Sequence, residues 1–498
     1  MMSASRSPVL RIFRVFGVVL LVVLVAQLVP AQAQAAGDYT QGVTQLDSAD
    51  ADIWFTPTTP SALVDVHYLI AGTPQQNFRM TNNNGTWQHA VGQLTGGTLI
   101  EYWFTYEKNG PLNDTPHFTY TQGGSGGGGG NGTFSVVFQN NTQGMWSASQ
   151  IYVLVLGMAT PGQWSYLLPN GTMTHINHLD ANAPGHLTKN GVNYANMSFT
   201  LAQAATVTIP THVEGGRVYI SVGSPIYIPI APDDSGWGGP DLHNPGDPNA
   251  NVYFDWYEFT YGYGTIAFGG NTTQVDMFGF PLTARLQQNA IGYDKSVGIT
   301  LSRSQVFSQY ASSVGPAFQP LAGTYRIVAP RSSASFEPGG TQANYLQAYL
   351  DQTWNEYTAN QFTLTRLNQT FTGRVVNGQL QFTKDGAGPF VLNKPTTADV
   401  LQCSGALASA GMTTTALELG AEFCAAFNRG VATNTANWYN PATYYTGAIK
   451  NDYAQFFHAV SIAHRAYGFA YDDINDQSSV QILPNTNPPS SLTIGVGW

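Results

Sequence analysis

Charge is scarce in this sequence. Only 10% of the 498 residues are Asp, Glu, Lys or Arg, against about 25% in an average globular protein. Lys and Arg number 19 against 29 Asp and Glu, so the chain lacks the excess of cations that a phosphate backbone attracts. We therefore expect no nucleic-acid partner. A disordered polyelectrolyte is excluded as well, because 43% of the residues are hydrophobic and 12% are aromatic.

Cysteine is almost absent. Cys403 and Cys424 are the only two in the chain. In an exported protein an even pair usually closes a disulfide, and this is our prediction. Two buried free thiols are the alternative.

Long hydrophobic runs are missing except near the N-terminus. There an apolar run over residues 15–26 follows three arginines and precedes a repeated A-x-A pattern at residues 31–36. This is the layout of a secretory signal peptide. An uncleaved membrane anchor is the alternative, but the run is shorter than the roughly 20 residues that span a bilayer. We expect residues 1–36 to be removed and the protein to be secreted, extracellular and free of the membrane after cleavage.

Neutral hydrogen-bonding residues and flat rings replace the missing charge. Gly, Asn, Thr, Gln, Tyr and Trp are abundant, and such surfaces suit sugars, which carry hydroxyls at their edges and C–H groups on their faces. Short strand-like segments separated by turn residues predict a β-sandwich over residues 38–121. The Gly-rich stretch within residues 122–132 predicts a flexible linker.

Residues 133–498 read as a second unit that is mainly β at first and mixed later. A stripe of Leu346, Leu350 and Trp354 predicts an amphipathic helix. A capping box at Thr415–Glu418 predicts another, which ends at Gly430, and Asp452 can cap a third. The fold class is thus mainly β, with a β-rich lobe that packs against a mixed α/β lobe. We expect strands at residues 133–138, 150–157, 163–168, 198–209, 217–222, 226–230, 252–261 and 265–280.

Two carboxylates stand out in this second unit. Glu258 and Asp276 each lie in a strand-like segment among aromatic and neutral polar residues. Two adjacent antiparallel strands would hold them in one groove, and alternation puts Trp256, Glu258 and Thr260 on the same face. A carboxyl group desolvated by aromatic neighbours suits a general acid, and glycosidic hydrolysis uses such a pair. Two unrelated surface carboxylates are the alternative.

The segments Asp255–Thr260 and Asn271–Pro281 resemble the signature of glycoside hydrolase family 64, and residues 215–223 and 466–473 resemble other parts of the family. The resemblance covers residues 133–498. It implies a thaumatin-like catalytic domain that cleaves β-1,3-glucan internally and releases laminaripentaose by inversion. It also implies that Glu258 is the general acid and Asp276 the general base. It further implies that Thr260 and Thr273 occupy positions that contact sugar. We add Asp255 and Trp256, which closely precede Glu258, as substrate-binding candidates.

The N-terminal sandwich resembles carbohydrate-binding module family 56, a β-1,3-glucan binder, over residues 63–68, 84–87, 102–106 and 114–120. Asp65 and His67 share a strand face and match polar contacts of that family. His117 stands where the resemblance leads us to expect Trp. The tryptophans of this module, Trp54, Trp87 and Trp103, are expected in its core.

Metal chemistry is not favoured by the sequence. His175 and His178 would face opposite sides of a strand, and the acidic loop at residues 233–247 lacks the glutamate spacing of an EF-hand. We expect no metal and no cofactor. For Asp472 and Asp473 we expect a structural hydrogen-bonding role.

The sequence thus predicts a monomeric endo-β-1,3-glucanase whose partner is β-1,3-glucan. A non-catalytic protein that binds the same glucan like a lectin is the alternative.

Overall fold

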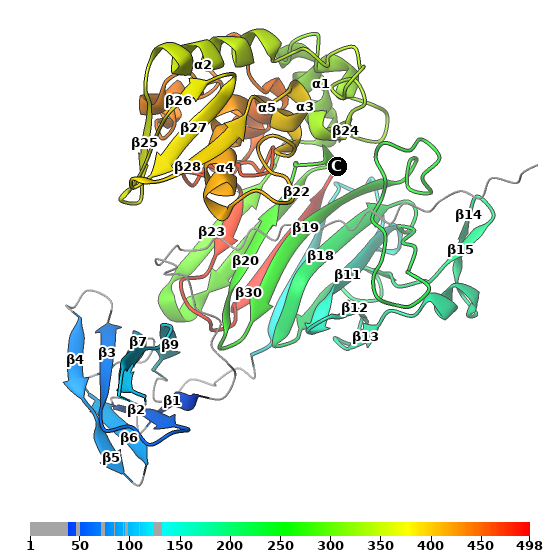
Figure 1. Cartoon of the computed structure of the whole chain (residues 1–498). Coiled ribbons are helices and arrows are strands. Elements are labelled where there is room, and N and C mark those ends of the chain that lie inside the picture. The colour runs from blue at the N-terminus through cyan, green and yellow to red at the C-terminus, as the bar shows by residue number, and fades with distance from the viewer. Residues whose placement is uncertain are drawn as a thin grey trace, which may run out of the picture. The chain divides into compact units, whose positions relative to one another are not determined.

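The computed structural model describes residues 38–45, 50–70, 75–83, 85–92, 94, 98–108, 110–122 and 132–498. The chain divides into two compact units, residues 1–128 and 129–498 (Figure 1). The predicted signal peptide and residues 123–131 of the predicted linker lie outside the described residues.

The N-terminal unit is a sandwich of two antiparallel sheets. Strand alternation buries residues such as Val66, Phe55 and Phe104 between the sheets and turns polar residues outward. The first sheet has the order β1-β2-β6-β5, and the second has the order β4-β3-β7-β8, with β9 also paired to β7. The strands are β1 (Tyr39–Gln45), β2 (Ala51–Pro57), β3 (Val64–Ile70), β4 (Gln76–Arg79), β5 (Thr81–Asn83), β6 (Thr86–Val91), β7 (Leu99–Glu107), β8 (Leu112–Asp114) and β9 (Phe118–Thr121).

The second unit begins with a β-rich lobe in which two sheets enclose one core. The smaller sheet has the order β17-β10-β30-β22-β23, and the larger runs β13-β12-β11-β18-β19-β20-β29, with β16 paired to β11. Most pairs are antiparallel, whereas β30 lies parallel to β10. The strands are β10 (Phe134–Asn141), β11 (Ile151–Thr160), β12 (Gln163–Leu167), β13 (Met173–His175), β16 (Phe199–Thr200), β17 (Thr206–Ile209), β18 (His212–Val222), β19 (Tyr253–Gly262), β20 (Ile266–Thr272), β22 (Leu282–Gln288), β23 (Tyr293–Gly298), β29 (Val480–Ile482) and β30 (Ser491–Gly497).

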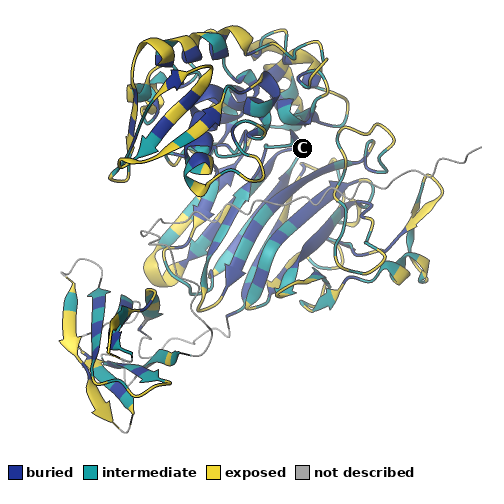
Figure 2. Ribbon diagram, viewed as in Figure 1, coloured by how far each residue is buried: buried dark blue, intermediate teal, exposed yellow. Residues whose placement is uncertain are grey.

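Most residues of the central strands β18 and β19 of the larger sheet are buried (Figure 2). Tyr257, Phe259 and Tyr261 of β19 point into the core between the sheets. Phe254 and Trp256 point to the opposite side, where they join a second apolar cluster with residues of the loops that follow β13 and β18. The predicted alternation along β19 is therefore confirmed.

Three of the predicted strands differ in the structure. Residues 226–230 form no strand, because Pro225 and Pro229 remove backbone donors that a ladder needs. Their only pairing is an isolated bridge between Ile230 and Trp237. Residues 198–209 divide into β16 and β17 around a turn, and residues 265–280 divide into β20 and β21 (Met277–Phe278).

The mixed lobe is inserted between β23 and β29. It has its own apolar core, which Phe278 of β21 enters from the β-rich lobe. An antiparallel meander β25-β26-β27-β28 lies beside the helices (Figure 1). The elements are α1 (Arg303–Ser313), β24 (Ile327–Val328), α2 (Gln347–Ala359), β25 (Phe362–Arg366), β26 (Gln369–Val376), β27 (Gln379–Lys384), β28 (Ala387–Asn393), α3 (Thr397–Gln402), α4 (Thr414–Asn428) and α5 (Asp452–Val460), and a separate hairpin pairs β14 (Leu187–Lys189) with β15 (Val192–Tyr194) in the β-rich lobe. The predicted fold class is confirmed.

The helices of this lobe confirm the predicted stripes but correct the caps. Leu350 and Trp354 are buried along α2. Helix α4 begins two residues earlier than predicted, because Thr413 and not Thr415 accepts a hydrogen bond from a backbone N–H, that of Ala416. Helix α5 is likewise capped by Asn451, one residue before Asp452.

The predicted disulfide is present. Cys403 at the C-terminus of α3 is bonded to Cys424 in α4. The bridge ties two helices of the mixed lobe together. Among the described residues, no helix combines the length and the hydropathy that crossing a membrane requires.

Candidate active site

Strand β19 displays Glu258 on the side of the larger sheet that faces away from the core between the sheets. In register, Glu258 lies opposite Arg217 of β18 on one side and Asn271 of β20 on the other. Its carboxylate receives hydrogen bonds from Arg217, at 2.7 Å from Nη2, and from Trp256, at 3.1 Å from Nε1. We call the surface formed by Arg217, Tyr219, Trp256, Glu258 and Asp276 the carboxylate face.

Asp276 joins this face from the turn between β20 and β21. The turn is short, because β20 ends at Thr272 and β21 pairs with β24 directly after Asp276. The backbone carbonyl of Asp276 accepts a hydrogen bond from the N–H of Ala329, and its side chain lies 3.4 Å from Nε of Arg331. Glu258 therefore lies on the first strand of the antiparallel β19–β20 hairpin, and Asp276 lies in the turn that follows its second strand.

Arg217 connects the two carboxylates electrostatically. Burial opposes the charge of its guanidinium, but Tyr219, Glu258 and Asp276 outweigh this effect and raise the pKa of Arg217. The phenol of Tyr219 is also buried, which raises its pKa, and it too senses both Glu258 and Asp276. Arg217 and Tyr219 thus interact electrostatically with both carboxylates.

The structure corrects the expected environment of Glu258. We predicted a carboxyl group desolvated by aromatic neighbours. Its side chain is instead 32% exposed and forms an ion pair with Arg217. The reason is the strand register, which places a cation directly opposite Glu258.

Asp255 does not belong to this face, so its prediction as a substrate-binding residue is wrong. It is 3% exposed and lies on the other side of β19, where it accepts hydrogen bonds from the N–H groups of Gly279 and Trp256. Burial raises the pKa of Asp255 to about 7, although these donors oppose the rise. Its carboxyl group fastens β19 to the segment that follows Asp276.

The two threonines differ. Thr260 is half-buried on the same side of β19 as Glu258, and its hydroxyl accepts a hydrogen bond from the N–H of Gly215. Thr273 is only 2% exposed, and its hydroxyl accepts the N–H of Val275 within the turn. The structure therefore gives Thr273 a role in shaping the turn before Asp276, and its contact with sugar stays a prediction. Trp256 is 4% exposed, so it reaches the face mainly through its indole N–H.

The mixed lobe holds this turn in place. The N–H of Gln274 donates to the carbonyl of Tyr467, and the hydroxyl of Tyr453 in α5 donates to the carbonyl of Gln274 at 2.6 Å. Burial raises the pKa of Tyr467 far above its usual range, and Asp473 and Glu258 add to the effect. Tyr467 thus brings the mixed lobe close to Glu258.

Sequence reasoning missed the roles of Arg217, Arg331 and Tyr467. Arg217 had a local signal, because it is an isolated cation in a strand segment of a chain with few cations. Arg331 had none, since it follows Asp276 by 55 positions and reaches it only through the pairing of β21 with β24.

The buried acid of the mixed lobe is structural, as predicted. Asp472 is fully buried and receives hydrogen bonds from Arg429, from the N–H of Gly468 and from His458. These contacts fix the segment that carries Tyr467.

In the N-terminal unit, Asp65, His67 and His117 lie on the outer side of the sheet that contains β3, β7 and β9. Asp65 forms an ion pair with Arg79. His67 lies opposite Trp103 in register, and the ring of His117 stacks on Trp103 with centroids 3.9 Å apart and an angle of 3°. We call His67, Trp103 and His117 the ring platform.

The predicted burial of the three tryptophans is correct only for Trp87, which is 6% exposed. Trp54 and Trp103 are half-buried on outward-facing strand positions. The alternation of β2 and β7 decides this, because Phe55 and Phe104 already fill the inward positions beside them.

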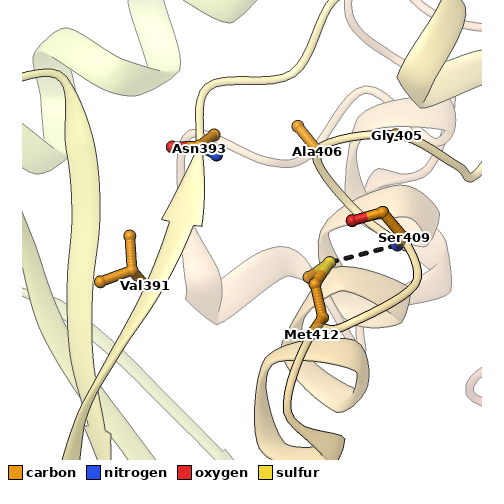
Figure 3. Close-up of a pocket in the computed structure, with 6 residues that line it drawn as sticks. All are labelled: Val391, Asn393, Gly405, Ala406, Ser409 and Met412. Carbon is orange, nitrogen blue, oxygen red and sulfur yellow. Dashed lines mark hydrogen bonds between the residues drawn. The ribbon is translucent and has the colours of Figure 1, made fainter.

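A separate small pocket lies in the mixed lobe (Figure 3). Its volume is about 290 Å³, and it shares no residue with the carboxylate face. It is lined by Val391, Asn393, Gly405, Ala406, Ser409 and Met412. In the described part of the chain, no three His, Cys, Asp or Glu side chains are grouped as metal ligands.

Two family models match this chain. The family model of β-1,3-glucanases known as glycoside hydrolase family 64 matches residues 132–496. The chain belongs to glycoside hydrolase family 64. The matched range includes both carboxylates and both arginines of the site. A second model, carbohydrate-binding module family 56, matches residues 41–115, which includes Asp65, His67 and Trp103.

Solved structures of family 64 are similar to this chain over most of its length. A β-1,3-glucanase domain from Clostridium beijerinckii is 34% identical, with a TM-score of 0.68, over 74% of this chain and 98% of that domain. A laminaripentaose-producing β-1,3-glucanase from Paenibacillus barengoltzii, solved with laminarihexaose, is 34% identical, with a TM-score of 0.60, over 93% of this chain and all of that one.

The curated relatives are more distant. A glucan endo-1,3-β-glucosidase from Arthrobacter sp. (strain YCWD3) is 28% identical over 300 residues, which are 58% of this chain and 53% of that protein. The chain therefore spans about half the length of the curated relatives that it matches.

Proposed function

We propose that this protein is a secreted endo-β-1,3-glucanase. The observation that carries the proposal is the carboxylate face. Two carboxylates, each paired with its own arginine, lie on the β19–β20 hairpin and in the turn that follows it, in a chain of glycoside hydrolase family 64. Relatives named as glucan endo-1,3-β-glucosidases and β-1,3-glucanases support the substrate class.

In the proposed reaction, Glu258 is the general acid and Asp276 is the general base. Glu258 donates its proton to the glycosidic oxygen, so that the leaving sugar departs as a neutral alcohol. Asp276 takes a proton from a water molecule, whose oxygen attacks the anomeric carbon from the opposite side. This route inverts the configuration at that carbon. Arg217 lies beside the proposed acid and Arg331 beside the proposed base.

For the product we propose laminaripentaose. The support comes from similar solved structures that are named as laminaripentaose-producing enzymes, one of them in complex with laminarihexaose. Analysis of the product mixture by chromatography tests this point, and a mixture without a dominant pentamer contradicts it.

Secretion rests on the leader at residues 1–36, whose charge and A-x-A pattern fit signal-peptidase cleavage. N-terminal sequencing of the exported protein tests it. For the N-terminal unit we propose β-1,3-glucan binding through the ring platform, because flat rings pack against the C–H faces of glucose residues. We further propose that the protein acts as a monomer.

Substitution of the two carboxylates tests the catalytic assignment. We expect Glu258→Gln and Asp276→Asn each to lower kcat on soluble β-1,3-glucan by about 10²–10⁴-fold, the usual contribution of a general acid or base. Binding of the glucan should persist, because each substitution preserves shape. The measurements are reducing-end release and isothermal titration with the same glucan.

Glu356→Gln and Asp294→Asn serve as controls, since they make the same chemical changes on α2 and β23, outside the carboxylate face. Near-normal turnover in either active-site variant would contradict the assignment. A wild-type protein that binds the glucan but never cleaves it would favour the lectin-like alternative.

A further inference from the structure

The hydrogen bonds to Glu258 are unevenly divided between its two oxygens. Both Arg217 and Trp256 donate to Oε1. In the part of the chain that the structure describes, no side chain or backbone N–H forms a hydrogen bond with Oε2. One oxygen is thus held as a double acceptor, and the other is left to carry a proton.

The position of Arg217 is itself fixed. Its Nη1 donates to the hydroxyl of Tyr219 at 3.0 Å. Its guanidinium carbon lies 5.4, 5.7 and 5.8 Å from the ring centroids of Trp256, Tyr219 and Trp237. Three rings at cation–π distance and two hydrogen bonds hold this cation in one orientation.

We propose that Arg217 is a positioning residue for the general acid: with Trp256, it holds Oε1 of Glu258 as an acceptor and so assigns the catalytic proton to Oε2. The proposal rests on the proposed function of Glu258. It adds which oxygen delivers the proton and which side chain decides this.

The proton balance is simple. Before the reaction, Oε2 carries the proton and Oε1 accepts hydrogen bonds as the carbonyl oxygen of the acid. The proton moves from Oε2 to the glycosidic oxygen, the bond from that oxygen to the anomeric carbon breaks, and Glu258 becomes a carboxylate. Arg217 stabilises the negative charge that develops on Glu258, since the cation is already in place before the charge appears.

Other charged and titratable groups also face this site. Tyr219 comes from β18 and Tyr467 from the segment after α5, and both sense Glu258. Asp276 and its partner Arg331 complete the set. Among these groups, Arg217 is the cation in direct contact with Glu258.

The test compares wild type, Arg217→Met and Arg217→Lys on two substrates. One is soluble β-1,3-glucan, and the other is a β-1,3-gluco-oligosaccharide with a 2,4-dinitrophenyl leaving group, which departs without protonation. On the glucan we expect Arg217→Met to lower kcat by about 100-fold, the scale of losing one preorganised donor, with KM changed less than about threefold. On the dinitrophenyl substrate the loss should shrink to less than about tenfold.

The comparison of leaving groups is a readout that a merely structural role would not change, because damage to the fold lowers the turnover of both substrates alike. Arg217→Lys keeps the charge but loses the planar fork, so it should show a smaller loss of kcat on the glucan than Arg217→Met.

Arg285→Met is the matched control, because it removes an exposed arginine from an ion pair with Asp294. Thermal unfolding of every variant identifies loss of fold, and Arg217→Lys carries the test if Arg217→Met does not fold. Equal losses on both substrates, or an effect confined to KM, would overturn the role of Arg217. Glu258→Gln is measured alongside. If it retains turnover on the glucan, the proposed function fails, and that result is distinct from failure of the Arg217 proposal.

Discussion

At the scale of single residues, the N-terminal unit depends on Trp103. Its outward position was not expected, and it supplies the aromatic surface that His117 alone would lack. His117 stacks almost parallel on Trp103 and also pairs with Glu101 through Nδ1 at 2.7 Å. His67 lies on β3, which pairs with β7, and its ring centroid is 5.4 Å from that of Trp103. The indole therefore holds both histidine rings in the platform.

We predict that Trp103→Ala in the full chain weakens retention on particulate β-1,3-glucan by about fivefold, because a stacked aromatic contributes about 1 kcal/mol. Turnover on soluble β-1,3-glucan should stay unchanged. A pull-down with particulate glucan, together with kinetics on the soluble polymer, measures both.

Trp54→Ala is the control, because Trp54 is also half-buried and faces outward, but from the other sheet. Equal loss of retention in the two variants would point to general destabilisation of the sandwich and would contradict the role of the ring platform.

At the scale of elements, a buried ion network joins two helices to the segment beside the active site. Arg429 follows α4 and His458 lies in α5, and both contact Asp472. The same segment presents the carbonyl of Tyr467 to Gln274, two residues before Asp276. The network therefore stabilises the segment that supports Asp276, the proposed general base.

This network makes a prediction about pH. Burial opposes the charge of His458, but Asp472 and the carbonyl of His464 outweigh it, so the pKa of His458 is raised. The pKa of Asp472 is lowered against its burial, chiefly by His458 and then Arg429. The stabilisation from His458 is complete below about pH 6.5, its unfolded value, and is lost as pH rises through the folded pKa. That from Asp472 is present above about pH 3.9 and is lost as pH falls through its folded pKa.

We expect His458→Gln to lower the free energy of unfolding by about 3 kcal/mol at pH 6 and to flatten the decline of stability above neutral pH. Urea unfolding between pH 5 and 9 measures both effects. His243→Gln, an exposed histidine beside Asp241, should retain the wild-type slope. If the slope persists in His458→Gln, another group causes it.

At the scale of the whole molecule, two units with separate cores share one chain. The N-terminal sandwich encloses its own aromatic core, and the second unit has three apolar clusters of its own. Because each unit buries its own core, the removal of one leaves the hydrophobic contacts of the other intact. A binding unit and a proposed catalytic unit joined in this way favour attack on an immobile polymer, since binding by one raises the local concentration of the other.

Deletion of residues 38–121 should therefore lower activity on particulate β-1,3-glucan and leave cleavage of soluble oligosaccharides nearly unchanged. Initial rates on the two substrates at equal enzyme concentration measure the ratio. A parallel loss on both substrates would indicate damage to the catalytic unit, and no loss on either would reduce the N-terminal unit to a spacer. Adsorption to cellulose serves as the specificity control, because equal retention on both polymers would contradict glucan recognition.

Local sequence patterns predicted much of the architecture. Alternation along β19 placed Glu258 and Trp256 on one face of the strand and Tyr257 and Phe259 on the other. Spacing along α2 identified its buried stripe. These patterns work because side-chain direction in a strand or helix repeats with a fixed period. Helix caps were missed by one or two residues, because neighbouring Thr and Asn residues can all cap and only the backbone path selects one.

The tertiary structure alone decided the partners of the proposed catalytic groups. Asp255 and Glu258 read alike as carboxylates in one motif, but the covering segment after Asp276 buries the first and leaves the second partly exposed. Arg331 and Tyr467 reach the site from positions far along the chain. The sequence by itself therefore determined most strands of the β-rich lobe, three helices of the mixed lobe and the acids that they carry. Which cations meet those acids depended on strand register and on the packing of the mixed lobe, because such contacts join residues that no local period relates.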